Sequence, residues 1–230
     1  LSKNKLLWTL WGSSVSMGTD QGIKIMKAVI FDMDGVLIDS EALHLYDFRV
    51  FLQKHNQNLT NDELSEFVGL DAKTFIGHLQ EIWKPVSPLP SIEEIKEGCK
   101  YPSDSFQDML VPHVRFILSH LKKNNIKIAI ASSSPYNIIY KMLSINDIDS
   151  YFDVIVSGND VQAKKPSPDI YFETLKRLEL PSNDCIVIED SLVGIQAAIN
   201  ARLYVIALKE NRFSVDQSKA DCIVNDLIEA

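Results

Sequence analysis

The stretch FDMDGVLIDS, residues 31–40, determines how the rest of the chain is interpreted. It follows the short apolar run Lys27–Ile30, whose brevity and β-branched residues predict a buried strand. Residues two apart in an extended chain project to the same side, so Asp32 and Asp34 are expected to share a small volume at the end of this strand. Two such carboxylates repel each other unless a cation or a proton lies between them. Gly35 then allows the backbone to turn away without a Cβ atom.

Length and composition limit the classes of protein to consider. The 230 residues suffice for one substantial domain, or for a domain with a smaller one inserted, and a hydrophobic content of 46% can form a core. The net charge of −8 argues against a large nucleic-acid surface, and no apolar run approaches the roughly 18 residues that span a bilayer. We therefore expect neither a nucleic-acid nor a membrane partner, and we expect a monomer.

The cysteines bear on the compartment. Cys99, Cys185 and Cys222 are widely separated and form no C-x-x-C pair. An odd number of such cysteines argues against a disulfide framework and fits a reducing compartment, so a cytoplasmic location is expected.

Residues 1–25 stand apart from the rest of the sequence. The apolar run Leu6–Trp11 follows Lys3 and Lys5, which weakly resembles the charged and apolar parts of a signal peptide. The apolar part is very short, and no clear small-x-small cleavage pattern follows it. Met26, just before the first strand, is a candidate native start. We interpret residues 1–25 as an extension or an added segment outside the fold, with a targeting peptide as the alternative.

A block without strand patterns follows the acidic motif. Leu45, Phe48 and Leu52 recur at helical spacing, and helices are expected over 41–55, 61–68 and 71–83. Ser91–Glu94 has the pattern of a capping box that opens another helix. This block predicts a helical insertion over residues 41–107, between core segments 26–40 and 108–230.

Helices and strands alternate in the second half of the chain. Ser134 and Ser167 are each followed by proline, which predicts a helix N-cap followed by proline at the first helical position. Strand followed by helix gives right-handed crossovers, so we predict an α/β fold with a doubly wound, Rossmann-like parallel sheet. The expected elements are helix 111–123, strand 126–131, a helix after 135, strand 152–156, a helix to 178, strand 185–188, a helix to 200, and strands 204–207 and 222–224.

Polar side chains follow four of these strands in order. They are Asp32 with Asp34, then Ser132, Lys165, and Glu189 with Asp190. Ligands of doubly wound sheets bind outside the carboxyl ends of the strands, so all four groups are expected at one rim. Each group considered by itself has a purely structural interpretation. Ser132 would be the neighbour of a helix cap, and Lys165 would be a solvated loop residue. Glu189 and Asp190 would be acids in the first turn of a helix. Their joint appearance after successive strands favours a functional site instead.

The chemistry that fits these groups is phosphoryl transfer. Asp32 is suited to attack phosphorus and form an aspartyl-phosphate. Because nucleophile and phosphate are both anionic, Mg²⁺ is required between them. Its predicted ligands are Asp32, the main-chain carbonyl of Asp34, and Asp190, with Glu189 bound directly or through water.

The remaining groups have distinct expected roles. Asp34 can act first as general acid for the leaving alcohol and then as general base for water. Ser132 offers a hydroxyl to the phosphate, beside the amides of the helix that follows. Lys165 places positive charge where negative charge develops.

These motifs resemble those of the haloacid dehalogenase superfamily, in its β-phosphoglucomutase-like phosphatase branch. The similarity runs from Met26 to the end of the chain. Its motifs are residues 32–41 for the nucleophile, Ala131–Ser132 for phosphate binding, Lys165–Asp169 for the lysine, and Glu189–Ile195 for the metal. The resemblance implies that residues 41–107 form a helical cap domain.

Two departures concern the mutases of that branch. The turn Val68–Asp71 is followed by Ala72 and Lys73 where the mutases carry an arginine, and Pro135 occupies the place of their lysine. Both positions help the mutases to hold a second phosphate. We therefore predict a Mg²⁺-dependent phosphatase of a small phosphorylated metabolite such as a sugar phosphate. The alternatives are a β-phosphoglucomutase and a non-catalytic phosphometabolite-binding module.

Overall fold

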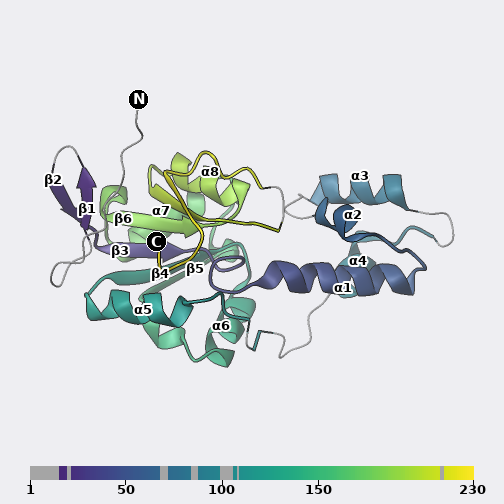
Figure 1. Cartoon of the computed structure of the whole chain (residues 1–230), viewed down its shortest axis with the longest axis horizontal. Coiled ribbons are helices and arrows are strands. Elements are labelled where there is room, and N and C mark those ends of the chain that lie inside the picture. The colour runs from purple at the N-terminus through teal and green to yellow at the C-terminus, as the bar shows by residue number, and fades with distance from the viewer. Residues whose placement is uncertain are drawn as a thin grey trace.

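The structure, a computed structural model, describes residues 16–19, 22–67, 72–83, 88–98, 106–107, 109–212 and 215–230. Within these ranges six parallel strands form a sheet in the order β5-β4-β3-β6-β7-β8 (Figure 1). The strands are β3 Ala28–Phe31, β4 Lys127–Ser132, β5 Val154–Ser157, β6 Cys185–Glu189, β7 Tyr204–Leu208 and β8 Cys222–Val224. This order reverses direction beside β3, so the predicted doubly wound fold is confirmed.

Helices connect the strands and cover both faces of the sheet (Figure 1). The core helices are α5 Val114–Lys123, α6 Tyr136–Ile145, α7 Asp169–Leu178 and α8 Leu192–Asn200. Single turns of 3₁₀ helix lie at η1 Asp149–Tyr151, η2 Gly158–Asp160 and η3 Ser182–Asp184. The elements expected from residue 111 onward are present, with ends that differ by at most three residues.

The central strand β3 shows how the two layers form. Val29 and Phe31 point into the cluster on one face, which contains side chains of α5 and α6 such as Leu118. Ala28 and Ile30 point into the opposite cluster, with side chains of α7 and α8. Because successive strand residues face opposite sides, a four-residue apolar strand buries both of its faces.

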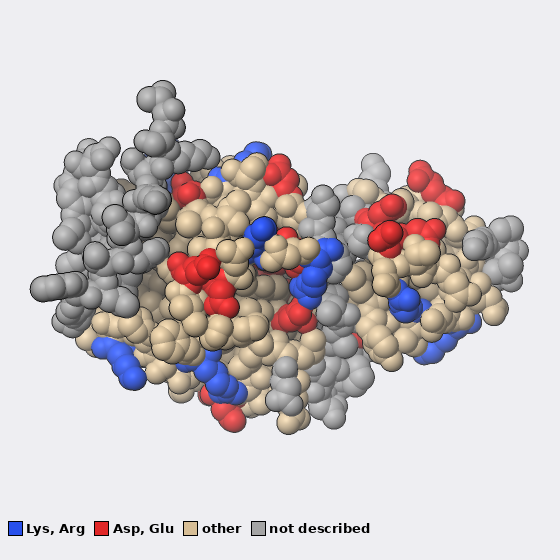
Figure 2. All heavy atoms as spheres, viewed as in Figure 1, with Lys and Arg blue, Asp and Glu red and all other residues tan. Residues whose placement is uncertain are grey.

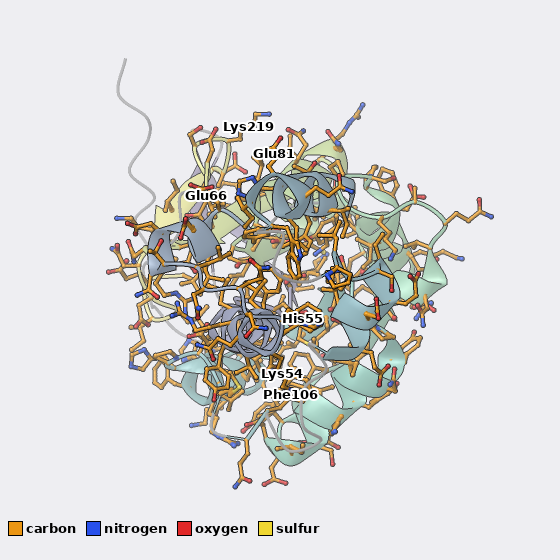
Figure 3. All side chains as sticks on the ribbon, turned by 90° about the vertical axis from the view of Figure 1, so that its right-hand side faces the viewer. Lys54, His55, Glu66, Glu81, Phe106 and Lys219 are labelled. Atoms are coloured by element: carbon orange, nitrogen blue, oxygen red, sulfur yellow. The ribbon has the colours of Figure 1, made fainter. Side chains whose placement is uncertain are left out.

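The helical insertion lies beyond the carboxyl ends of the strands (Figure 1). Its helices are α1 Ser40–Lys54, α2 Asn61–Ser65, α3 Ala72–Ile82 and α4 Ile92–Gly98. Phe48, Phe67 and Phe75 pack together at its centre, with ring centroids 5.0–5.1 Å apart. Figure 3 views this part end-on, with Glu66 and Glu81 on its outside. The described residues of the insertion contain no strand, as the sequence predicts.

The capping box predicted for α4 is confirmed. The N–H of Ser91 donates to the Glu94 carboxylate at 2.7 Å, and the N–H of Glu94 donates to the Ser91 hydroxyl at 3.2 Å. Helix α2 ends at residue 65 rather than 68, and the turn at 68–71 lies outside the described residues.

Two predicted helix starts are wrong by one residue. Pro135 and Pro168 occupy the N-cap positions of α6 and α7, and neither helix has a side-chain cap. Ser134 and Ser167 use their hydroxyls elsewhere, the latter by donating to Asp169 at 2.7 Å. The Ser-Pro pattern therefore located the start of each helix but misassigned the serine.

Two short strands lie in the N-terminal segment. Strands β1 Ser16–Thr19 and β2 Gly22–Ile25 form an antiparallel pair just before β3. This pair is a sheet separate from the six-stranded one, so the interpretation of residues 1–25 as an extension or an added segment stays a prediction. Residues 1–15, 20 and 21 lie outside the described part. Among the described helices, none has the length and hydropathy needed to cross a membrane.

Candidate active site

The carboxyl ends of the parallel strands bring the predicted side chains together at one rim of the sheet. Asp32 follows β3, Ser132 ends β4, and Glu189 ends β6 with Asp190 directly after it. Lys165 comes from the loop between η2 and α7, and its ammonium lies 2.6 Å from Asp32 Oδ1. Groups up to 158 residues apart in sequence (Asp32 to Asp190) therefore line a single site.

The Lys165 ammonium is enclosed by oxygen atoms. It donates to Asp32 Oδ1 at 2.6 Å, to Glu189 Oε1 at 2.7 Å and to the main-chain oxygen of Ala131 at 3.0 Å. All three ammonium protons thus have acceptors, and the side chain is only 4% exposed. Burial by itself lowers the pKa of Lys165, but the charges of Asp32 and Glu189 outweigh it and hold the pKa well above its ordinary value.

The pKa of Asp32 is also raised, but here burial prevails over the attraction of the neighbouring ammonium. Burial raises the pKa of its carboxyl to about 7, and although Lys165 opposes this shift, the charges of Glu189 and Asp34 reinforce it. One ammonium therefore does not balance the acidic groups that surround Asp32. The protein by itself leaves an excess of negative charge at this rim.

Asp32, Glu189 and Asp190 form a group of oxygen donors. Each offers an oxygen, and these atoms lie within 4.8 Å of one another. Gly35 makes room for this arrangement: its φ is +81°, and a Cβ atom there would lie 1.9 Å from Asp190 Oδ2. A set of hard oxygen donors with excess negative charge fits Mg²⁺.

Glu189 is held on both of its oxygens. Oε1 accepts from Lys165 and, at 2.9 Å, from the hydroxyl of Tyr171; Oε2 accepts from the N–H of Asp190 and from the N–H and hydroxyl of Ser191. A Cβ atom on Gly194 would lie 1.8 Å from Oε1, so α8 packs directly on this carboxylate. Sequence reasoning missed Tyr171, because a tyrosine on the buried face of α7 looks like any core aromatic.

Asp34 is held by two serines. The hydroxyl of Ser40 donates to Oδ1 at 2.8 Å, and the hydroxyl of Ser134 donates to Oδ2 at 3.0 Å. The hydroxyl of Ser132, which is fully buried, accepts from the N–H of Ser134 at 3.0 Å. Sequence analysis included Ser40 only as part of the nucleophile motif and assigned Ser134 as a helix cap, so neither was predicted to bind Asp34.

Comparison with known proteins places this site in a family. The haloacid dehalogenase-like hydrolase family matches residues 29–208. The chain belongs to this family. It is 34% identical over 178 residues to a phosphorylated carbohydrates phosphatase of Thermotoga maritima, covering 76% of this chain and 82% of that protein.

Two further relatives agree with this placement. Hexitol phosphatase B of Escherichia coli K12 is 29% identical over 187 residues, covering 79% of this chain and 82% of that protein. The crystal structure of a putative beta-phosphoglucomutase from Thermotoga maritima is 29% identical, with a TM-score of 0.69 over 86% of this chain and 94% of that one. The resemblance to the β-phosphoglucomutase-like branch is therefore confirmed.

A cavity of about 310 Å³ opens beside the site of this haloacid dehalogenase-like hydrolase. Gly35, Asp190 and Arg212, the last in the segment after β7, are among the residues that line it. Arg212 donates to both oxygens of Asp39 at 2.7 and 2.8 Å, just before α1. In Figure 2 basic and acidic side chains occur together where the core meets the insertion.

The arrangement determines what the haloacid dehalogenase-like site can do. A buried carboxylate lies against an ammonium, beside oxygen donors suited to a divalent cation. A second carboxylate, Asp34, lies two residues away and accepts from the hydroxyls of Ser40 and Ser134, groups that can either donate a hydrogen bond or accept one. These are the components of nucleophilic attack on an anionic substrate combined with acid–base catalysis.

Proposed function

We propose that this haloacid dehalogenase-like hydrolase is a Mg²⁺-dependent phosphatase that cleaves a small phosphorylated metabolite through an aspartyl-phosphate. One observation carries the proposal: Lys165 lies between Asp32 and Glu189, at 2.6 and 2.7 Å, beside an oxygen cluster completed by Asp190. These contacts support a nucleophile, a positive counter-charge and a cation site within one small volume.

In the first step an oxygen of Asp32 forms a bond to phosphorus while the bond from phosphorus to the ester oxygen breaks. Asp34 gives its proton to that oxygen, so the alcohol leaves neutral. The Lys165 ammonium, 2.6 Å from Asp32, offsets the charge that develops on the transferred group. Ser132 and the amides at the start of α6 bind the phosphoryl oxygens.

In the second step water attacks the phosphorus of the aspartyl-phosphate. Asp34, now ionised, takes the proton from water as the bond between Asp32 and phosphorus breaks. Inorganic phosphate leaves, and both carboxylates return to their starting states. In this mechanism Asp32 is the nucleophile and Asp34 is the group that donates and accepts the proton.

The cation would be held by a carboxylate oxygen of Asp32, the main-chain carbonyl of Asp34, and Asp190, with Glu189 as the fourth protein group. When bound, Mg²⁺ neutralises the phosphate and the nucleophile enough for them to approach each other. Because both oxygens of Glu189 already accept hydrogen bonds, we propose that Glu189 contributes mainly by holding Lys165 and by adding negative charge.

The names of two relatives support a proposal for the substrate class. Their names specify phosphorylated carbohydrates and hexitols, so sugar and polyol phosphates are the substrates proposed for this chain. We propose that residues 41–107 act as a cap domain over a core formed by 26–40 and 108–230. A cytoplasmic location, a monomeric state and the absence of a nucleic-acid partner remain predictions. Light scattering after gel filtration would measure the molar mass in solution and so test the monomeric state.

A mutase is the second candidate, favoured by the similarity to a putative beta-phosphoglucomutase. Pro135, the N-cap residue of α6, carries no charge that could bind a second phosphate. This absence of a charged side chain at that position favours hydrolysis over isomerisation. The cap position that departs from the mutases follows residues 68–71, which lie outside the described part.

A panel of phosphorylated sugars, polyols and small acids, assayed with Mg²⁺ for phosphate and for isomerised product, tests the proposal. Phosphate release that stops on addition of a chelator supports it. Isomerisation that requires a sugar bisphosphate would establish the mutase. Binding of these compounds without any turnover would support the third alternative, a non-catalytic phosphometabolite-binding module.

A further inference from the structure

The partners of Asp34 have a chemical property that matters for a proton carrier. Both of its oxygens accept from hydroxyls, those of Ser40 and Ser134, at 2.8 and 3.0 Å. We propose that Ser134 is a positioning residue that fixes the Asp34 carboxyl through this 3.0 Å hydrogen bond from the core. This inference rests on the proposed function, in which Asp34 is first an acid and then a base.

A hydroxyl suits this task better than an N–H group. An ionised carboxylate only accepts hydrogen bonds, whereas a protonated one must also donate. A serine hydroxyl can rotate and do either, so it keeps its partner when Asp34 gains or loses a proton. An ammonium or amide N–H in the same place would favour the ion alone and oppose the acid step.

Ser134 is anchored firmly enough to position another group. Its N–H donates to the hydroxyl of Ser132 at 3.0 Å, and its carbonyl accepts from the hydroxyl of the fully buried Ser157 at 2.7 Å. Gly158 packs so closely on this loop that a Cβ atom there would lie 2.5 Å from the carbonyl oxygen of Ser133. The main chain of Ser134 is thus fixed by β4 and by the end of β5, within the core.

Ser40 differs from Ser134 in its attachment. It is the first residue of α1, so its hydrogen bond to Asp34 depends on how the helical insertion begins. Ser134 supplies the contact that comes from the core itself. Its hydroxyl serves Asp34 rather than the helix behind it, because α6 has Pro135 at its N-cap and no side-chain cap.

The test compares single hydroxyl deletions in the same loop. Ser134→Ala removes the contact to Asp34, and Ser133→Ala removes a neighbouring, exposed hydroxyl as the matched control. Kcat and KM are measured with an alkyl phosphate from the active panel and with 4-nitrophenyl phosphate, whose leaving group needs little protonation. We expect Ser134→Ala to lower kcat for the alkyl ester by roughly tenfold to a hundredfold, the cost of one hydrogen bond to a charged group, with a smaller loss for the aryl ester and little change in KM.

Two further variants test whether Ser134 acts through Asp34. Ser134→Thr keeps the hydroxyl and should restore most of the lost kcat. In an Asp34→Asn background, Ser134→Ala should cause almost no additional loss, because the group that it positions is already disabled. Melting temperatures identify any variant that loses activity by unfolding, and Ser134→Thr still provides the comparison in that case.

Several results would contradict the positioning role of Ser134. A raised KM with equal losses for both esters would make Ser134 a phosphate ligand and overturn the inference. Full additivity with Asp34→Asn, or a Ser134→Ala enzyme equal to the Ser133→Ala control, would do the same. If the parent protein releases no phosphate from any ester, the proposed function itself fails; if the parent is active and only the serine effect is missing, the inference alone fails.

Discussion

The rim of the sheet and the helical insertion are stabilised in different ways. At the rim, ionic groups hold one another: Lys165 is 4% exposed and donates to three oxygens, and Glu189 is fully buried among donors. In the insertion, a cluster centred on Phe48 and Phe67 holds the helices together, and charges such as Glu66 and Glu81 lie on the outside (Figure 3).

This difference separates chemistry from recognition. An ionic network whose buried donors are paired with acceptors tolerates little change, because a buried charge that loses its partner lowers the free energy of unfolding. An apolar cluster accepts many side chains of similar volume, so its outer surface can change without loss of the fold. We therefore expect substitutions at the rim to affect turnover, and substitutions across the insertion to affect stability or substrate preference.

The largest effect is expected at Asp32. Asp32→Asn keeps the volume of the side chain but removes the attacking carboxylate, so turnover should fall by roughly 10⁴-fold or more. Lys165 keeps Glu189 as a counter-charge in this variant. Because the pKa of Asp32 is raised to about 7, its ionised form is disfavoured in the folded state, so the metal-free variant should be at least as stable as the parent at neutral pH. Steady-state assays and thermal melts check both points; a folded variant with near-parental activity would exclude Asp32 as the nucleophile.

Asp34→Asn should cost less and should show which half-reaction suffers. The variant keeps the main-chain carbonyl, so Mg²⁺ binding should survive, while each proton-transfer step should slow by roughly 10²–10⁴-fold. With an aryl phosphate the first step is partly spared and the second is not. Phosphorylated enzyme should then accumulate, visible as an added phosphate by mass spectrometry. Loss of Mg²⁺ affinity, or equal slowing with alkyl and aryl esters and no intermediate, would contradict the acid–base role.

A pair of glycine substitutions contrasts the two regions directly. Gly35→Ala introduces a Cβ atom 1.9 Å from Asp190 Oδ2 at a φ of +81°, so we expect loss of Mg²⁺ affinity and at least about 1–2 kcal/mol of stability. Gly77→Ala, in α3, meets nothing within 4 Å and should stabilise the protein by about 0.5–1 kcal/mol. Calorimetric Mg²⁺ titration and thermal melts measure both. Equal behaviour of the two variants would contradict the contrast between the regions.

The smallest effect concerns Asp160, which accepts from the N–H of Ser157, the residue whose hydroxyl holds the carbonyl of Ser134. Burial alone would raise the pKa of Asp160, but hydrogen bonds from Tyr136 and the N–H of Ser157, together with Arg177, hold the pKa below its usual value. A lowered pKa in the folded state means that the unfolded chain binds more protons at acidic pH, so this contribution is complete above about pH 4 and is lost below it.

Asp160→Asn should therefore reduce the free energy of unfolding by about 1 kcal/mol at pH 7, and the difference from the parent should shrink as the pH falls below 4. Urea titrations across this range measure it. Tyr140→Phe, on the exposed side of α6, serves as a control that should show no such pH dependence. A difference that is constant from pH 7 to pH 3 would argue against an ionised Asp160 in this network.

Local patterns in the sequence sufficed for the sheet and for the rim. Alternation of strands and helices identified the doubly wound fold, and the ends of four strands located Asp32, Ser132, Lys165 and Glu189. These predictions succeed because side-chain direction in a strand repeats every two residues, and because parallel strands all end at the same edge. The two-residue repeat of a strand and the common edge of parallel strands both follow from backbone geometry, without knowledge of which side chains are in contact in the folded protein.

Only the tertiary structure decided the partners. Ser134 has the sequence pattern of a helix cap, yet its hydroxyl donates to Asp34, 100 residues away, and Tyr171 reaches Glu189 from the buried face of α7. A hydroxyl beside a helix can satisfy a local N–H or a distant carboxylate, and the bond to the charged group is the stronger one. Which of the two lies within reach depends on the packing of β3 against β4 and β6, and no local pattern encodes that packing.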